Sequence, residues 1–215
     1  MPVRTVDDLT RVYSPQEWVD VTVEGMPQAP VWSVGDGLFW APTVARAADG
    51  QWFLHATFDN TDFNVWAFGL DPNLDQPRDA YGLGGYWPVP VFWRTEPWEG
   101  YVMENPAMVR DPYSGSYALA YSTVDLWFRP THAVGVARCA GPLGGCVTAP
   151  NGPWIVQGSV GTGPGGLSFF TDRDGALRVV YASWPPGGEY SWPRRATAAS
   201  VRDVATRPTL VPLTR

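Results

Sequence analysis

The segment VMENPAMVRDPYSGSYALAYST, residues 102–123, has the pattern of a β-hairpin. An apolar run follows a proline, the chain turns through an aspartate-containing stretch that ends at Gly115, and an alternating run returns. Tyr117, Leu119 and Tyr121 lie two, four and six positions after that glycine. Large residues at every second position are typical of a half-buried strand. This segment therefore predicts two antiparallel strands joined by a tight turn.

The same hairpin recurs twice, as LFWAPTVARAADGQWFLHATF at 38–58 and GTGPGGLSFFTDRDGALRVVYAS at 161–183. Its turn glycines are Gly50, Gly115 and Gly175, which are 65 and 60 residues apart. A further strand-like segment follows each hairpin, at 63–70, 132–139 and 194–202. Repeated antiparallel units of this kind favour an all-β protein built from the blades of a β-propeller. A β-sandwich would explain the alternation as well, but not the three matching hairpins.

The amino-acid composition limits which kinds of protein this chain can be and which kinds of ligand it can bind. A chain of 215 residues with 45% hydrophobic and 17% charged residues can bury a core and is not a disordered polymer. The net charge of −6 and the absence of a basic run argue against nucleic acid as a partner. No apolar run approaches the roughly 20 residues of a membrane helix. The 12 tryptophans suit flat, neutral ligands such as sugars, although aromatic residues also favour strands.

Two cysteines, Cys139 and Cys146, flank the glycine-containing segment CAGPLGGC. A disulfide there would close a small loop and imply an oxidising compartment; two reduced thiols are the alternative. Two cysteines and two histidines, His55 and His132, fall short of the usual four-ligand pattern, so no metal site is predicted. The start MPVRTVDDLTRVY lacks a charged head followed by an apolar core, and no signal peptide is predicted from it.

Four segments together resemble the five-bladed β-propeller glycosidases of glycoside hydrolase family 43, which include arabinanases, arabinofuranosidases and xylosidases. They are residues 38–46, 97–123, 134–146 and 163–184. The resemblance implies one incomplete β-propeller over residues 1–215, with about three full blades. The expected parts are a partial first blade at 1–30, a blade at 31–70, a connection at 71–100, a blade at 101–147 and the last blade at 148–215.

The resemblance also implies inverting hydrolysis of arabinose- or xylose-containing glycans. Such chemistry uses a general acid and a general base about 6.5–9.5 Å apart. The family's acid lies in an E-x-P motif, which Glu104 matches in MENPAMV. Apolar neighbours would raise the pKa of that carboxyl towards the working pH. The alternative is a structural glutamate at a strand end, paired with Arg110 or Arg94, while Glu99 is expected to orient its loop.

The family's two aspartates are harder to place. The segment that contains Asp7 and Asp8 resembles the outer part of the first blade, which would put the base upstream of Met1. Asp71, in the dipeptide Asp71-Pro72, is the one candidate for the aspartate that tunes the acid, and it fits a turn better. Hydrolysis by this chain alone is therefore expected to be weak or absent. The alternatives are a non-catalytic carbohydrate-binding propeller and a truncated, inactive relative.

Trp40, Trp93 and Trp98 are candidate platforms for sugar rings, with core packing as the alternative for each. The expected partner is an oligo- or polysaccharide, with no cofactor, nucleic acid or membrane. Several relatives carry a histidine beside a central ion where this chain has Gly166, so no such ion is predicted. The family and the cysteine pair imply an extracellular protein. Open blade edges would allow self-association.

Overall fold

The computed structural model describes residues 38–59, 64–70, 77–78, 89–158, 161–189, 193–202 and 209–212. Within these ranges the chain forms thirteen β-strands and one short 3-10 helix. The elements are β1 (Leu38–Arg46), β2 (Trp52–Asp59), β3 (Asn64–Leu70), β4 (Pro77–Arg78), β5 (Val89–Phe92), η4 (Pro97–Glu99), β6 (Met103–Arg110), β7 (Tyr117–Thr123), β8 (Ala133–Cys139), β9 (Val147–Thr148), β10 (Thr162–Thr171), β11 (Leu177–Trp184), β12 (Arg195–Arg202) and β13 (Thr209–Pro212).

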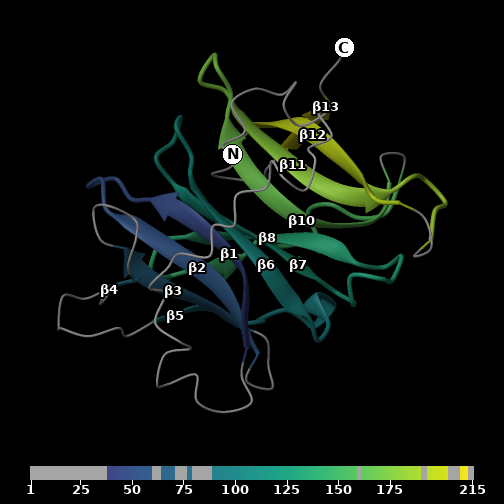
Figure 1. Ribbon diagram of the computed structural model, residues 1–215, viewed down its shortest axis with the longest axis horizontal. Coiled ribbons are helices and arrows are strands. Elements are labelled where there is room, and N and C mark those ends of the chain that lie inside the picture. The colour runs from purple at the N-terminus through teal and green to yellow at the C-terminus, as the bar shows by residue number, and fades with distance from the viewer. Residues whose placement is uncertain are drawn as a thin grey trace, which may run out of the picture.

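The strands form three antiparallel sheets, which fan out around a shared inner region (Figure 1). The first sheet has the order β1-β2-β3-β4 with β5 also paired to β3, the second β6-β7-β8-β9, and the third β10-β11-β12-β13. The strands β1, β6 and β10 begin their sheets, and β6 packs against both of the others. They are therefore the innermost strands of three propeller blades. The predicted all-β, incomplete propeller is confirmed, and so are the three hairpins, β1–β2, β6–β7 and β10–β11.

The segment expected as a connection, 71–100, also contributes strands to the first blade. The strand β5 pairs with β3, through Val65 opposite Phe92 and Ala67 opposite Val89. Three of the four β5 residues are buried, because they pack against the second sheet. A run of only four strand residues between unpatterned stretches is too short to stand out in a sequence.

Aspartate and glycine residues close the three hairpin turns. Gly50, Gly115 and Gly175 have φ angles of 89°, 73° and 80°, a left-handed conformation that favours glycine. In the second and third turns the side chains of Asp111 and Asp172 accept hydrogen bonds from backbone N–H groups two to four residues on. The turn residues seen in the sequence therefore act through their backbone geometry and local hydrogen bonds.

Each innermost strand carries a β-bulge at the same position. The register shifts between Trp40 and Thr43 in β1, between Glu104 and Ala107 in β6, and between Gly165 and Ser168 in β10. The residues inside the bulges, Ala41, Asn105 and Gly166, all have positive φ angles of 52°, 52° and 62°. A bulge leaves a residue outside the ladder, and so it tolerates the proline that follows in β1 and β6. In β6 the residues of the E-x-P motif therefore form this bulge.

Two apolar cores lie between the three blades, one at each interface between neighbouring sheets. One lies between the first and second sheets and contains Tyr117, Leu119 and Tyr121 of β7. The other lies between the second and third sheets and contains Ala118 and Ala120 of the same strand. All seven residues of β7 are buried as a result, where the alternation had predicted a half-buried strand. The middle blade is covered on both faces, so the large residues fill one core and the small alanines allow close approach on the other.

Cys139 and Cys146 form the predicted disulfide, which closes a loop between β8 and β9. The described residues include no helix with the length and hydropathy required to cross a membrane.

Candidate functional site

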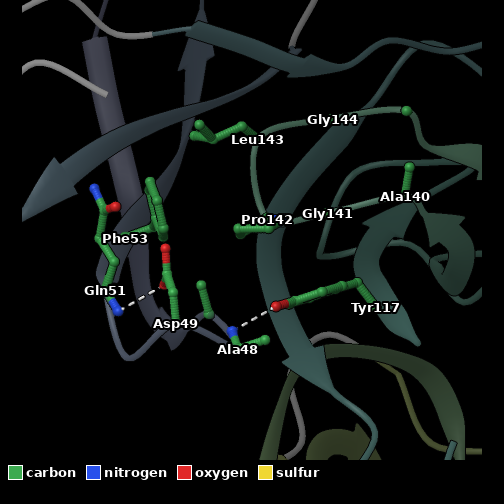
Figure 2. Close-up of a pocket in the computed structure, with 12 residues that line it drawn as sticks. Ala48, Asp49, Gln51, Phe53, Tyr117, Ala140, Gly141, Pro142, Leu143 and Gly144 are labelled. Carbon is green, nitrogen blue, oxygen red and sulfur yellow. Dashed lines mark hydrogen bonds between the residues drawn. The ribbon is translucent and has the colours of Figure 1, made fainter. Parts of the chain in front are cut away.

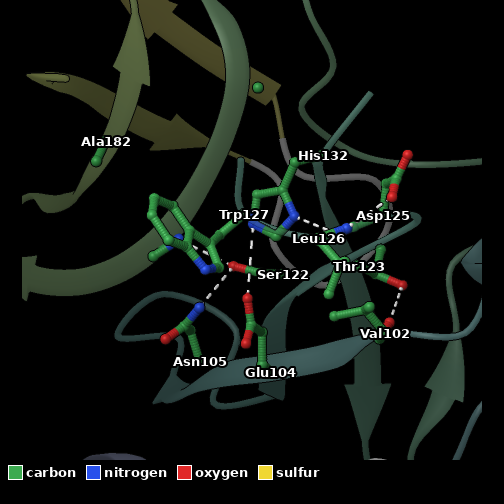
Figure 3. A network of polar contacts seen from close by, with 12 residues as sticks. Val102, Glu104, Asn105, Ser122, Thr123, Asp125, Leu126, Trp127, His132 and Ala182 are labelled. Carbon is green, nitrogen blue, oxygen red and sulfur yellow. Dashed lines mark hydrogen bonds and ion pairs between the residues drawn. The ribbon is translucent and has the colours of Figure 1, made fainter. Parts of the chain in front are cut away.

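Glu104 is the second residue of β6 and lies directly before its bulge, opposite Ser122 of β7. Its side chain is 15% exposed, so it is largely enclosed and still reachable from solvent. The imidazole of His132 stands beside it, with Nε2 of His132 4.0 Å from Oε1 of Glu104 (Figure 3). A carboxyl group of this kind, at the inner end of a blade, can exchange a proton with a bound molecule.

His132 enters the site from the end of the loop that joins β7 to β8. It is 1% exposed, and its Nδ1 atom lies 2.6 Å from the carbonyl oxygen of Asp125. Burial lowers the pKa of His132; the contact with the Asp125 carbonyl opposes that change, and the positive charge of Arg194 adds to it. The imidazole is therefore kept neutral at neutral pH.

Ser122 ties the bulges of β6 and β10 together. Its hydroxyl oxygen accepts hydrogen bonds from Nδ2 of Asn105 over 3.2 Å and from the backbone N–H of Gly166 over 2.9 Å. Ser122 is 1% exposed, so these two bonds form away from solvent. The bulge residues Asn105 and Gly166, which directly follow Glu104 and Gly165, are thus held by one hydroxyl, and this fixes where the Glu104 side chain leaves its strand.

Arg194 brings a positive charge to the same region from the segment before β12. Its guanidinium donates to the carbonyl oxygens of Gly163 and Ala182 over 2.6 and 2.7 Å. Burial lowers the pKa of Arg194, and the negative charge of Glu104 counteracts part of that effect. Two basic groups, His132 and Arg194, thus stand near Glu104. The expected rise in the pKa of Glu104 stays a prediction.

Trp93 lines a cavity of about 430 Å³ on the segment that leads into β6, with its side chain 50% exposed. Arg94, Thr95, Glu96, Pro97 and Gly100 complete its lining. Trp98 is only partly exposed, and its indole N–H is buried. An exposed indole beside polar groups suits a sugar ring, and of these two tryptophans Trp93 has that setting.

Glu99 holds this segment in place. Its carboxylate accepts hydrogen bonds from the backbone N–H groups of Thr95 and Glu96, both over 2.7 Å, and from the hydroxyl of Tyr121 over 2.5 Å. The side chain is fully buried. Glu99 therefore orients the loop before β6, as expected from the sequence, and is not placed to meet a ligand in solvent.

Two aromatic residues near the site were not predicted from the sequence as candidate site residues. Trp127, on the loop between β7 and β8, is 46% exposed, and its carbonyl oxygen accepts a hydrogen bond from Arg194 over 3.3 Å. Tyr101 is 52% exposed and donates to the carboxylate of Asp125 over 3.2 Å. Both lie on loops at the Glu104 end of the β6–β7 hairpin, where Gly100 bridges to Val124. Isolated aromatics in irregular segments show no periodicity, which is why the sequence did not single them out.

Two of the predicted site residues lie outside the described part of the chain, namely Asp71 and the side chain of Trp40, whose backbone belongs to β1. Asp7 and Asp8, expected in the outer part of the first blade, also lie outside it. Trp40 has the same position relative to its bulge as Glu104 has in β6. Within the described residues no three His, Cys, Asp or Glu side chains form a group that could hold a metal ion.

A second and larger cavity, of about 610 Å³, lies at the opposite end of the strands (Figure 2). It is bounded by the turn after β1 and by the disulfide loop, and the N–H of Ala48 donates to the hydroxyl of Tyr117 across it over 2.8 Å. Because Tyr117 pairs with Arg110 at the far end of β6, this cavity is remote from Glu104. The candidate site is therefore the end of the blades where β6 begins.

Comparison with known proteins gives structural matches only. No protein-family model matches the sequence, and no curated protein matches it. Three similar solved structures are a thermostable family-43 glycoside hydrolase, an endo-1,4-beta-xylanase from Bacteroides thetaiotaomicron and an alpha-L-arabinanase from Cellvibrio cellulosa complexed with arabinohexaose. Their identities are 20%, 18% and 15%, with TM-scores of 0.67, 0.65 and 0.60.

The matches cover 82%, 81% and 80% of this chain, but only 59%, 59% and 56% of those enzymes. The chain thus spans little more than half of their length. Two observations identify the fold. The innermost strands of all three blades carry the same bulge, and the structural likeness extends over about four fifths of the chain. The protein has the β-propeller fold of the family 43 glycoside hydrolases, in an incomplete form.

Proposed function

We propose that the protein is a glycoside hydrolase that acts on arabinose- or xylose-containing glycans by inversion, with Glu104 as the general acid. The observation that carries this proposal is the place of Glu104. It lies at the inner end of the middle blade, beside the bulge that an E-x-P motif creates, and it is largely enclosed. A general acid needs such a setting, because it must keep its proton out of bulk water and still reach the glycosidic oxygen.

The proposed reaction is a single displacement. The O–H bond of the Glu104 carboxyl breaks as its proton moves to the glycosidic oxygen, and the bond from that oxygen to the anomeric carbon breaks with its electron pair going to the oxygen. Water attacks the anomeric carbon from the opposite face and loses a proton to a general base. That base is not assigned to any described residue. Asp71 stays a proposal for the aspartate that tunes the acid.

Exposed aromatic residues near Glu104 support a carbohydrate ligand. Trp93 and Trp127 are each about half exposed, on loops that flank the start of β6. An aromatic face packs well against the C–H side of a sugar ring, and the polar groups that line the Trp93 cavity can bind hydroxyl groups. The arabinanase with a similar fold was solved with arabinohexaose. An oligosaccharide is therefore the proposed substrate, and the disulfide is in keeping with an extracellular site of action.

The test is hydrolysis of aryl arabinofuranosides, aryl xylosides and the corresponding polysaccharides. We expect Glu104→Gln to reduce kcat by about 100-fold or more on polysaccharide, with unchanged substrate binding, because only proton donation is lost. The matched control is Asp174→Asn, in the exposed turn between β10 and β11, far from Glu104. Proton NMR of the first product formed distinguishes inversion from retention. Equal rates for the wild type and Glu104→Gln would remove Glu104 from the mechanism.

A non-catalytic carbohydrate-binding propeller is the second candidate. It is favoured by one observation: two basic groups, His132 and Arg194, stand near Glu104. Without a base the site would bind a glycan and leave it intact. Calorimetric binding of arabino- or xylo-oligosaccharides by a protein that releases no reducing sugar would establish this alternative.

A further inference from the structure

The cavity of about 610 Å³, at the opposite end of the strands from Glu104, lies between two short segments of the chain (Figure 2). One wall is the turn between β1 and β2, and the other is the disulfide loop, residues 140–145, between β8 and β9. The buried side chains of Phe53 and Tyr117 also line it. Ligand sites in proteins commonly have volumes of about 300–1,000 Å³. The cavity therefore has room for a small ligand, away from the candidate site at Glu104.

The disulfide loop is fixed at both ends and in its middle. Cys139 and Cys146 join its two ends covalently. In the middle, the carbonyl oxygen of Pro142 accepts a 2.7 Å hydrogen bond from Nε2 of the buried His55. Leu143 packs against the apolar core between the first and second sheets. A ligand that binds against this wall does not have to order it first, and so less entropy is lost on binding.

The turn between β1 and β2 is also held by several bonds. The backbone N–H of Ala47 donates to the carbonyl oxygen of Gln51 over 2.8 Å, and the N–H of Gln51 donates to the carboxylate of Asp49 over 3.0 Å. The N–H of Ala48 donates to the hydroxyl oxygen of Tyr117 over 2.8 Å, which joins the turn to the middle blade. Both walls of the cavity are therefore formed by bonds within the protein itself, as in most ligand sites.

The side chains of the cavity combine hydrogen-bonding groups with apolar surface. The carboxylate of Asp49 accepts hydrogen bonds, the amide of Gln51 can donate and accept, and the hydroxyl of Tyr117 has a hydrogen to donate besides the bond that it accepts. Tyr117 is 8% exposed, so its hydroxyl is largely shielded from bulk water. Apolar surface comes from Pro142 and Leu143, which lie across the cavity from Asp49 in Figure 2.

The charge of the lining limits the class of ligand. None of the described residues that line the cavity has a basic side chain, and Asp49 contributes a negative charge. An anion such as a phosphate would therefore be repelled. A neutral polyhydroxylated molecule fits the lining better, because its hydroxyl groups both donate and accept. Its C–H groups can pack against the apolar side chains.

We propose that this cavity is a second carbohydrate-binding site, which holds a short stretch of a neutral arabinose- or xylose-containing glycan. The choice of these sugars rests on the proposed function, while the preference for a neutral polyol rests on the lining of the cavity. The second site and the site at Glu104 lie at opposite ends of the strands, so they can bind different parts of one polysaccharide. Binding at one site then raises the effective concentration of the polymer at the other.

The first test is an NMR titration of Glu104→Gln with arabino- and xylo-oligosaccharides, in which hydrolysis does not consume the ligand. The signals to follow are the methyl groups of Leu143 and the backbone N–H groups of Gly141 and Gly144, which line the cavity. We expect these signals to shift and to saturate with a Kd on the order of 1 mM, as a few hydrogen bonds and a small apolar contact would give. Unshifted signals at about 20 mM oligosaccharide would overturn the inference.

Gly141 allows a variant that fills the cavity. A Cβ atom added there would meet no other atom within 4 Å, and the φ angle of Gly141 is not left-handed, so a side chain is tolerated without backbone strain. In Gly141→Leu the oligosaccharide should no longer shift the Leu143 methyl signals. An unaltered His55 imidazole signal in this variant shows that the contact with Pro142 is kept. Shifts as large as before in Gly141→Leu would overturn the inference.

Asp49→Ala tests the polar side of the cavity and has a matched control. Asp49 stands directly before Gly50 in the first hairpin turn, and Asp174 stands directly before Gly175 in the third, away from the cavity. We expect Asp49→Ala to weaken oligosaccharide binding at the cavity by about fivefold, because one hydrogen bond to a carboxylate is lost, and Asp174→Ala to leave it unchanged. Equal Kd values in the two variants would overturn the role of Asp49 and with it the inferred site.

The second site and the proposed function can fail separately. Hydrolysis that depends on Glu104, in a protein whose cavity signals do not respond to oligosaccharides, would overturn the second site and leave the proposed function in place. Saturable shifts at the cavity in a protein that hydrolyses no glycoside would support the second site and refute the proposed function. Shifts produced by inorganic phosphate and by none of the oligosaccharides would overturn the assignment to a neutral polyol.

Discussion

The hydroxyl of Tyr121 donates a 2.5 Å hydrogen bond to the carboxylate of Glu99, and neither side chain is exposed to solvent. Burial, followed by the bond to Glu99, raises the pKa of Tyr121 far above its usual range. The pair joins the segment before β6 to the centre of the middle blade. It therefore links the position of Trp93 to the packing around β7.

We expect Glu99→Gln to destabilise the protein by about 2–4 kcal/mol, because a buried carboxylate with several donors is replaced by an amide whose NH2 group would face N–H and O–H donors. Urea unfolding measures this loss, with the exposed Glu189→Gln as the control. A double-mutant cycle with Tyr121→Phe should give a coupling energy of about 1 kcal/mol or more. Additive effects of the two changes would show that the hydrogen bond contributes nothing.

Removal of the disulfide should destabilise the protein by about 2.5 kcal/mol, the chain-entropy estimate for a loop of about eight residues. The carbonyl oxygen of Pro142 in this loop is the partner of the buried His55 ring, 2.7 Å away. Reduction should therefore also change the His55 NMR signal. Because the chain has two cysteines only, a reductant acts on this bond alone. Identical unfolding curves with and without reductant would contradict the prediction.

Acid should destabilise the protein through His55. Burial lowers the pKa of His55 from 6.5 to about 4. The unfolded chain therefore binds a proton at a higher pH than the folded one, and stability is lost as pH falls from about 6.5 to about 4. The full effect is about 3 kcal/mol. His55→Gln should flatten the stability curve in this window, measured by urea unfolding at each pH. The lowered pKa of His132 acts in the same direction and remains in that variant.

Trp127→Ala should weaken binding of an arabino- or xylo-oligosaccharide by about 1 kcal/mol, or roughly fivefold in Kd, if its exposed indole stacks on a sugar ring. Trp93→Ala is expected to have a similar effect. Tyr113→Ala is the matched control, since Tyr113 is 72% exposed in the turn at the opposite end of the β6–β7 hairpin. Calorimetric titration measures all three. If Tyr113→Ala weakens oligosaccharide binding as much as Trp127→Ala does, Trp127 is not a platform for a sugar ring.

The sequence by itself determined the strands of the three hairpins, their turns and the repeat. Gly50, Gly115 and Gly175 mark three turns because a left-handed backbone favours glycine, and period-two alternation follows from strand geometry. These are local properties, so they are readable along the chain. The short spacing of the cysteine pair allowed a disulfide for the same reason, and the structure decided between that bond and two thiols.

Only the tertiary structure decided what surrounds each acid. Glu99 and Glu104 lie five residues apart in similar apolar sequence, yet one accepts bonds from a buried tyrosine and two backbone groups while the other faces a histidine. His132 and Gly165 come from segments 28 and 61 residues beyond Glu104. Their contact depends on how whole blades pack against one another, and no local periodicity encodes the distance between side chains on different sheets.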